Sequence, residues 1–306
     1  MLTIVAACSP KPNKSEVDSA KALDIQAESD TGTITSGQFR LRYRIEGTGS
    51  PAIVIGSSIY LPRAFSQNLR KHLRLVFLDH RGYAPSPGPM DASRFAPDTL
   101  LEDIERARLI LGLDRIVVIG HSIHALMALE YAKKYPRNVT HVVMIGPTVF
   151  HAASDQAREQ YWQEFASPER KAVMEENRQR LPDEQLAKLR RGQRFIRSYI
   201  RDGPRIWYNP RFDASSLWKG VEANDDYTPA FLDIDISRGL DTFDIPTFLA
   251  LGRYDFRVAP PSTWDDITPK FHDLTINIFE RSGHWPHYEE AALFDAKLLR
   301  WVEEHQ

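Results

Sequence analysis

Short, unbroken apolar runs are the sequence feature that most constrains how this chain can fold. They cover residues 52–55, 75–78, 116–119, 141–145 and 247–251. A strand that is buried on both faces reads as such a run, as in parallel sheets. Helical periodicity over residues 99–113 and 123–134 separates several of the runs and gives a βαβ order. The sequence therefore predicts an α/β fold, a mostly parallel sheet flanked by helices.

The two ends of this pattern differ from its middle. Residues 37–47 alternate between apolar side chains and arginines, which predicts a half-exposed antiparallel edge strand. A last strand over residues 274–279 and a helix over residues 289–304 are expected to complete the sheet and its cover.

The strand–helix order stops between Pro147 and Leu240 and resumes afterwards. This stretch is rich in charged helical segments and aromatic residues. We therefore expect a core formed by residues 31–146 and 241–306, with residues 147–240 inserted as a helical cap. Within the cap, arginines at helical spacing form one face, which is either solvated or suited to an anionic surface; they are Arg190, Arg194, Arg197 and Arg201.

Ser122 occupies the position expected of a nucleophile. It lies in Gly120-His121-Ser122-Ile123-His124, directly after one apolar run and directly before an apolar helix. A tight turn from strand to helix exposes the serine hydroxyl above the carboxyl edge of the sheet and leaves N–H groups free at the helix N-terminus.

A serine hydroxyl needs a base to remove its proton, and the base needs an orienting acid. Asp255 follows the run at 247–251, and His284 follows the strand expected at 274–279. The carboxyl ends of parallel strands share one edge of the sheet, so all three groups are expected to meet there. The chain order Ser, Asp, His is that of the α/β-hydrolases.

From residue 37 to residue 306 the chain resembles the α/β-hydrolase family. Residues 79–86, Asp-His-Arg-Gly-Tyr-Ala-Pro-Ser, resemble the family's Asp-x-Arg-Gly-x-Gly-x-Ser turn, and Ser282-Gly283-His284 resembles its histidine loop. The resemblance implies an oxyanion hole made by two backbone N–H groups. Ile123 would supply one and Ser58 the other, with Ser57 as the next candidate.

His124 departs from the family, which generally has glycine at this position. It is interpreted either as a packed or capping residue or as a donor that supports the site of the acyl group from behind the groups that contact it. His-x-x-His spacings occur twice, but no further ligand cluster accompanies them, so we expect no metal and no organic cofactor.

These features predict a serine hydrolase that cleaves an ester or amide of a small, hydrophobic substrate through an acyl-enzyme. Trp162 and Trp207 of the expected cap are candidate substrate contacts. A second hypothesis is a prolyl aminopeptidase-like exopeptidase, whose substrate amine would contact Glu222, Asp225 or Asp226. A third, of a different class, is a ligand-binding receptor that keeps the fold with little turnover.

Residues 1–30 are expected to form a signal remnant and a flexible tether. Small residues precede Cys8 as in a bacterial lipobox, so Cys8 is a candidate for lipidation and for membrane anchoring outside the cytoplasm; the alternative is a cytoplasmic protein with a frayed N-terminus. A net charge of −2 provides no basic field for nucleic acid. Nothing in the sequence indicates an oligomeric state.

Overall fold

The computed structural model describes residues 30–306 apart from residues 86–91, 148–151, 224–230, 232–233 and 259. The lipidation candidate Cys8 and two of the candidate amine-binding residues, Asp225 and Asp226, lie outside the described residues. Within the described part of the chain, no helix is both long and apolar enough to cross a membrane.

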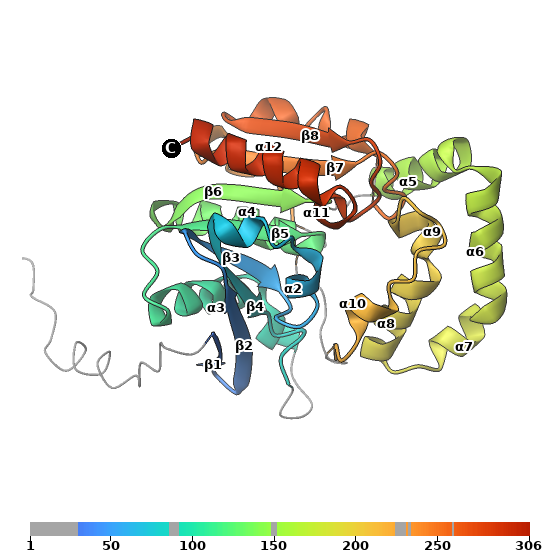
Figure 1. Ribbon diagram of the computed structural model, residues 1–306, viewed down its shortest axis with the longest axis horizontal. Coiled ribbons are helices and arrows are strands. Elements are labelled where there is room, and N and C mark those ends of the chain that lie inside the picture. The colour runs from blue at the N-terminus through green and yellow to red at the C-terminus, as the bar shows by residue number, and fades with distance from the viewer. Residues whose placement is uncertain (1–29, 86–91, 148–151, 224–230, 232–233, 259) are drawn as a thin grey trace, which may run out of the picture.

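One sheet of eight strands, in the order β1-β2-β4-β3-β5-β6-β7-β8, forms the centre of the described chain (Figure 1). β2 is antiparallel to both of its neighbours, β1 and β4, and every other pair is parallel. The predicted α/β fold with a mostly parallel sheet is confirmed. The strands are β1 Thr31–Ser36, β2 Phe39–Glu46, β3 Ser50–Gly56, β4 Leu73–Asp79, β5 Ile116–His121, β6 Val139–Ile145, β7 Thr247–Gly252 and β8 Leu274–Phe279.

The alternating segment at 37–47 became β2, but the prediction that it is the edge strand is wrong. Its apolar side chains Phe39, Leu41 and Tyr43 are buried as expected. β1 pairs along its outer side and takes the edge. In β1 only Ile34 and Ser36 are buried, so too few apolar residues were present for the sequence pattern to reveal a strand.

Most of the helices lie between strands, as the βαβ order requires. α4 covers the predicted residues 123–134, whereas the helix expected at 289–304 is broken at Glu290 into α11 and α12. The α-helices are α2 Leu61–Ala64, α3 Pro97–Ile110, α4 Ile123–Lys134, α5 Ala152–Phe165, α6 Pro168–Arg180, α7 Asp183–Ala187, α8 Arg191–Arg201, α9 Gly203–Ile206, α10 Ser215–Trp218, α11 Pro286–Glu289 and α12 Ala291–Glu304. The 3₁₀ turns are η1 Leu69–Lys71, η2 Ala92–Phe95, η3 Pro136–Asn138, η4 Leu240–Thr242, η5 Pro261–Trp264 and η6 Thr268–Lys270.

Two apolar cores lie on the two faces of the sheet. One contains side chains of α3 and α4 packed against alternate sheet residues such as Ile53 and Val118. The other contains side chains of α2 and α12 packed against the intervening residues, such as Val54 and Val117. Because successive residues of a strand point to opposite faces, this division explains why the central strands read as unbroken apolar runs.

The helices α5–α10, which we call the helical insertion, lie between β6 and β7 in the chain. Figure 1 shows them beside the end of the sheet at which the parallel strands finish. Aromatic side chains of the insertion, among them Tyr199, Trp207 and Trp218, belong to the same apolar cluster as Val54 of β3 and Val117 of β5. The insertion is therefore packed against the sheet domain through a shared core.

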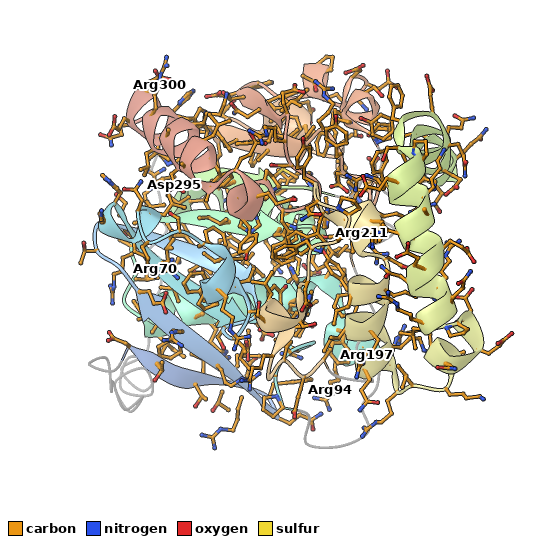
Figure 2. All side chains as sticks on the ribbon, turned by 45° about the vertical axis from the view of Figure 1, so that its right-hand side comes forward. Arg70, Arg94, Arg197, Arg211, Asp295 and Arg300 are labelled. Atoms are coloured by element: carbon orange, nitrogen blue, oxygen red, sulfur yellow. The ribbon has the colours of Figure 1, made fainter. Side chains whose placement is uncertain are left out.

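The arginines on one face of α8 do not form a uniform cationic patch. Arg201 pairs with Asp183 and Asp202. Arg194 donates to the carbonyl groups of Ala187 and Leu189, whereas Arg197 is exposed on the insertion (Figure 2). These contacts favour the interpretation of a solvated face whose charges are partly used within the molecule.

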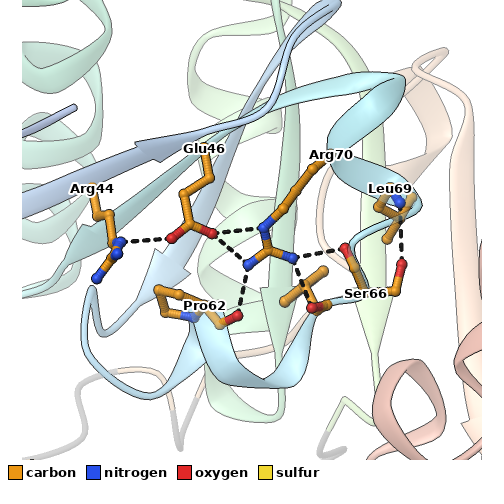
Figure 3. A network of polar contacts seen from close by, with 7 residues as sticks. Arg44, Glu46, Pro62, Ser66, Leu69 and Arg70 are labelled. Carbon is orange, nitrogen blue, oxygen red and sulfur yellow. Dashed lines mark hydrogen bonds and ion pairs between the residues drawn. The ribbon is translucent and has the colours of Figure 1, made fainter.

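Arg70 ties the segment after β3 to the sheet. Its guanidinium donates to Glu46 of β2 and to the carbonyl oxygens of Pro62, Phe65 and Ser66 around α2 (Figure 3). Arg70 is buried, and its fork of N–H donors satisfies carbonyl groups at the end of a one-turn helix. This network fixes the chain that follows the loop at residues 57–60.

A buried ion pair joins the turn after β4 to α3. Arg81 Nε donates to Asp103 Oδ2 at 2.6 Å, and Arg81 Nη2 donates to Asp103 Oδ1 at 2.9 Å. Ser36 Oγ donates to the same carboxylate. Both charged side chains are buried, so each depends on the other for its solvation.

We predict that Asp103→Ala lowers the free energy of unfolding by about 3–5 kcal/mol, because it leaves the Arg81 charge buried and unpaired. Asp98→Ala, which removes the exposed partner of Lys134 from the same helix, is the control and should change it by less than about 1 kcal/mol. Urea unfolding followed by fluorescence measures both. Equal effects of the two substitutions would contradict the prediction.

Candidate active site

Ser122 lies on a strained turn between β5 and α4. Among the described residues it is the one non-glycine residue with a positive φ, 59°. Its N–H donates to the Ile145 carbonyl at the end of β6 at 2.8 Å. A Cβ at Gly120 would lie 2.0 Å from the His124 carbonyl oxygen, so the turn can be this tight only with glycine there. The strain agrees with a position held for function rather than for packing.

Asp255 and His284 meet as the sequence predicted. His284 Nδ1 lies 2.7 Å from Asp255 Oδ2, and both side chains are buried. The other carboxylate oxygen, Oδ1, accepts the N–H groups of Arg257 and Val258. Because both of its oxygens accept hydrogen bonds, the carboxylate is fixed in orientation. It selects the imidazole tautomer that carries its proton on Nδ1.

The other nitrogen of this imidazole faces no donor. His284 Nε2 is buried and has no hydrogen-bond partner in the described part of the chain. In this structure the Ser122 hydroxyl therefore forms no hydrogen bond with it. Both residues lie against the end of β6: Ser122 bonds to Ile145, and a Cβ at Gly146 would lie 3.1 Å from His284 Nδ1. The structure thus brings Ser122 and His284 to one edge of the sheet.

The structure argues against one predicted oxyanion donor. The Ser58 N–H donates to Asp79 Oδ1 at 2.6 Å and is already used by a buried carboxylate. Burial raises the pKa of Asp79, and the Ser58 N–H and Arg42 guanidinium partly offset that rise. Assigning the second donor to Ser58 is therefore at odds with this contact. Ser57, the next candidate, lies one residue closer to β3.

His124 is a packed residue. It is buried, its ring centroid lies 4.7 Å from that of His80, and its Nδ1 lies 3.2 Å from the His121 carbonyl oxygen. Since a carbonyl only accepts, Nδ1 carries the proton, and burial lowers the pKa of His124 to about 4. At neutral pH its Nε2 therefore has no proton to donate, which disfavours the alternative role as a donor to substrate.

The candidate substrate residues of the insertion have different surroundings. Trp207 stacks on Trp285, next to His284, with ring centroids 5.4 Å apart. Trp162 instead packs against Phe256 and under the guanidinium of Arg205. Glu222 is exposed. Of the three, only Trp207 is brought beside the histidine loop.

Contacts that the sequence did not reveal tie the insertion to the histidine loop. The His284 N–H donates to the Ile206 carbonyl at 2.6 Å. Glu289 accepts the N–H groups of Gly283 and Tyr208, at 2.8 and 2.5 Å. Burial raises the pKa of Glu289 to about 8, against the effect of these donors. The insertion therefore helps to hold His284 in place.

Arg170 of α6 also holds residues 204–208 of the insertion in place. Its guanidinium donates to the carbonyl groups of Pro204, Trp207 and Tyr208, and its side chain is buried. The family motifs gave no signal for Arg170, because its partners are carbonyl groups more than thirty residues away.

Buried histidines surround the candidate site. His121 Nε2 donates to the His284 carbonyl at 2.8 Å. Both nitrogens of His287 are buried without a partner among the described residues, beside His121 and Phe65. Burial lowers the pKa of His287 to about 3. This side chain binds a proton more readily in the unfolded chain than in the folded one. Above pH 6.5 it is neutral in both states, and as the pH falls from 6.5 towards 3 its protonation in the unfolded chain lowers the free energy of unfolding.

We predict that His287→Leu makes unfolding less sensitive to acid. At pH 7 the variant should be as stable as the wild type or more so, because it removes a buried polar ring without partners. Between pH 6.5 and 4.5 the wild type should lose about 2 kcal/mol relative to the variant. Thermal unfolding across this range measures the difference, with His272→Leu at the surface as the control. Parallel curves for wild type and His287→Leu would contradict the prediction.

Comparison with known proteins agrees with this geometry. Residues 49–291 match the family model described as "alpha/beta hydrolase fold". The chain is 37% identical over 279 residues to the AB hydrolase superfamily protein YclE of Bacillus subtilis, covering 89% of this chain and 99% of that protein. It is 24% identical over 270 residues to a proline iminopeptidase of Heyndrickxia coagulans, covering 84% and 92%.

A similar fold occurs in the solved structure of an esterase from Exiguobacterium antarcticum. It has a TM-score of 0.61 and 18% identity, and the match covers 89% of this chain and 99% of that one. Together with the mostly parallel sheet and the serine on its strained turn after β5, the family match shows that this chain belongs to the α/β-hydrolase fold family.

Proposed function

We propose that this protein is a serine hydrolase that cleaves an ester or amide bond through an acyl-enzyme. The observation that carries the proposal is the buried Asp255–His284 hydrogen bond of 2.7 Å, which leaves Nε2 of the imidazole unpartnered among the described residues, near the strained turn of Ser122. A base of this kind makes a neutral serine hydroxyl nucleophilic.

In the proposed mechanism, the Ser122 side chain rotates towards His284 and Nε2 removes its proton as Oγ attacks the carbonyl carbon. The negative charge moves to the carbonyl oxygen, where the N–H of Ile123 and the N–H of Ser57 stabilise it. When the tetrahedral intermediate collapses, the imidazolium donates its proton to the leaving alcohol or amine. Water, deprotonated by Nε2, then attacks the acyl-enzyme, and Ser122 recovers its proton as the acid is released.

Asp255 supports this cycle electrostatically. Its carboxylate holds the Nδ1 proton and stabilises the imidazolium that forms after each proton transfer. Two backbone N–H groups, from Arg257 and Val258, donate to its second oxygen and hold the carboxylate in this orientation.

Aromatic side chains next to His284 support a substrate with an apolar or ring-bearing group. Tyr199 and Trp218 come from the insertion, and Tyr60, Tyr83 and Trp285 come from loops after strands. Their rings form a chain of contacts with centroids 4.8–6.2 Å apart. We propose that the insertion acts as a cap over the site, because two of these rings, Tyr199 and Trp218, belong to it. Apolar walls with few polar groups are typical of small-molecule sites.

We predict that a fluorophosphonate probe labels Ser122 and that Ser122→Ala abolishes labelling. Asp255→Asn should lower kcat for 4-nitrophenyl esters about 10³- to 10⁴-fold, because the imidazole loses its orienting charge. Ser237→Ala, which removes a half-buried serine hydroxyl that donates to Asp235, is the control and should label as the wild type does. Mass spectrometry of the labelled peptide identifies the site. A folded wild type that resists the probe and cleaves no ester would favour the low-turnover receptor instead.

A second candidate function is a prolyl aminopeptidase-like exopeptidase, favoured by the proline iminopeptidase among the relatives. Proline 4-nitroanilide with a free amine distinguishes it from an esterase, with N-acetylproline 4-nitroanilide and esters of increasing acyl length as comparisons. Cleavage of the free-amine anilide alone, with a raised KM in Glu222→Gln, would make this the main function. Cleavage of esters alone would exclude it.

A further inference from the structure

Arg257 lies on the loop that carries the proposed catalytic acid, two residues after Asp255. Its backbone N–H donates to Asp255 Oδ1 at 2.9 Å, so the position of Arg257 is fixed relative to that carboxylate. Its side chain is half-buried, and the guanidinium carbon Cζ lies 5.7 Å from the centre of the Tyr199 ring. The cation is thus held against the insertion.

Among the described residues, no carboxylate forms an ion pair with Arg257. Within the described part of the chain, its guanidinium forms no hydrogen bond either. Its contact with the Tyr199 ring is a cation–π interaction. Other arginines near the site differ. Arg253 on the same loop pairs with Glu280 at 2.8 Å, and buried Arg170 donates to three carbonyl groups. A half-buried guanidinium with its N–H donors unused is available for an anion.

The same tyrosine connects Arg257 to the catalytic histidine. The centre of the Tyr199 ring lies 6.4 Å from that of His284. The Tyr199 hydroxyl accepts the Nε1–H of Trp285 at 3.0 Å, and the ring is buried. The ring cannot move away easily, so the guanidinium and the imidazole are both placed against one fixed aromatic side chain.

The contact with Tyr199 leaves the donors of Arg257 free to act. A guanidinium over an aromatic ring is attracted through its face, while its N–H groups point outward from its edge. Two of those N–H groups match the two oxygens of a carboxylate. One positive charge balances one carboxylate, whereas a phosphate dianion would require further cations.

We propose, on the basis of the serine hydrolase function proposed above, that Arg257 binds a carboxylate group of the substrate. The enzyme then selects esters or amides that carry a negative charge away from the bond that is cleaved. Arg257 determines specificity in this scheme and takes no part in the transfer of protons.

Matched pairs of esters test this proposal. Mono-4-nitrophenyl adipate and 4-nitrophenyl hexanoate differ by a carboxylate on the acyl side, and 4-acetoxybenzoate and its methyl ester differ by a carboxylate on the leaving side. The readout is the ratio of kcat/KM for the charged ester to that for the neutral one. In the wild type, one pair should show a ratio above 1. Arg257→Gln should lower that ratio roughly ten- to hundredfold, mainly through KM, since a charge-assisted pair is lost.

Three further variants sharpen the test. Arg257→Lys keeps the charge but not the paired N–H groups, and should give an intermediate ratio. Arg257→Glu should reverse the preference in favour of the neutral ester. Arg253→Gln removes one positive charge from the same loop and should keep the wild-type ratio, which separates a local contact from a general change in charge.

The outcomes separate this proposal from the one on which it rests. If Ser122 is labelled by the fluorophosphonate but the wild type does not prefer the charged member of either pair, the role of Arg257 is overturned and the serine hydrolase remains. The role is also overturned if Arg257→Gln slows both members of a pair equally, as loss of support for Tyr199 would do. A folded wild type that neither labels nor cleaves any of these esters would overturn both proposals.

Discussion

The hydrogen bond between Asp255 and His284 is the contact on which the rest of the site depends. It joins the loop after β7 to the loop after β8, and it is buried, so water does not compete for the carboxylate. Two backbone N–H groups fix the far oxygen of Asp255, and the His284 backbone is fixed by Ile206. The imidazole is therefore oriented before any substrate arrives, which is what electrostatic preorganisation requires.

The helical insertion takes part in this orientation as well as lying beside the site. Arg170 holds the carbonyl groups of residues 204, 207 and 208, and Glu289 holds the N–H groups of Gly283 and Tyr208. A movement of the insertion that separated residues 206–208 from the sheet would have to break the His284–Ile206 hydrogen bond. The position of His284, the proposed catalytic base, and the position of the proposed cap are thus coupled through one short segment of backbone.

The sequence predicted the parts of the fold that rest on local pattern. Unbroken apolar runs identified the buried parallel strands, and the boundaries of α4 were predicted correctly because a strand, a serine turn and an apolar helix follow one another directly. β1 escaped notice because only two of its side chains are buried. The Ser58 assignment conflicts with the structure because the Ser58 N–H, expected to stabilise an oxyanion, donates instead to Asp79 at the end of the neighbouring strand.

By itself, the sequence determined the fold class and the order Ser122, Asp255, His284 along the chain, since unbroken apolar runs mark buried parallel strands and each of the three residues follows an expected strand. Only the tertiary structure decided which groups meet. Arg170, Ile206, Glu289 and the pairing of Arg257 with Tyr199 each join residues from different elements. Such contacts depend on how the insertion packs on the sheet. They join residues far apart in the chain, and the periodicity of a single sequence predicts only local structure.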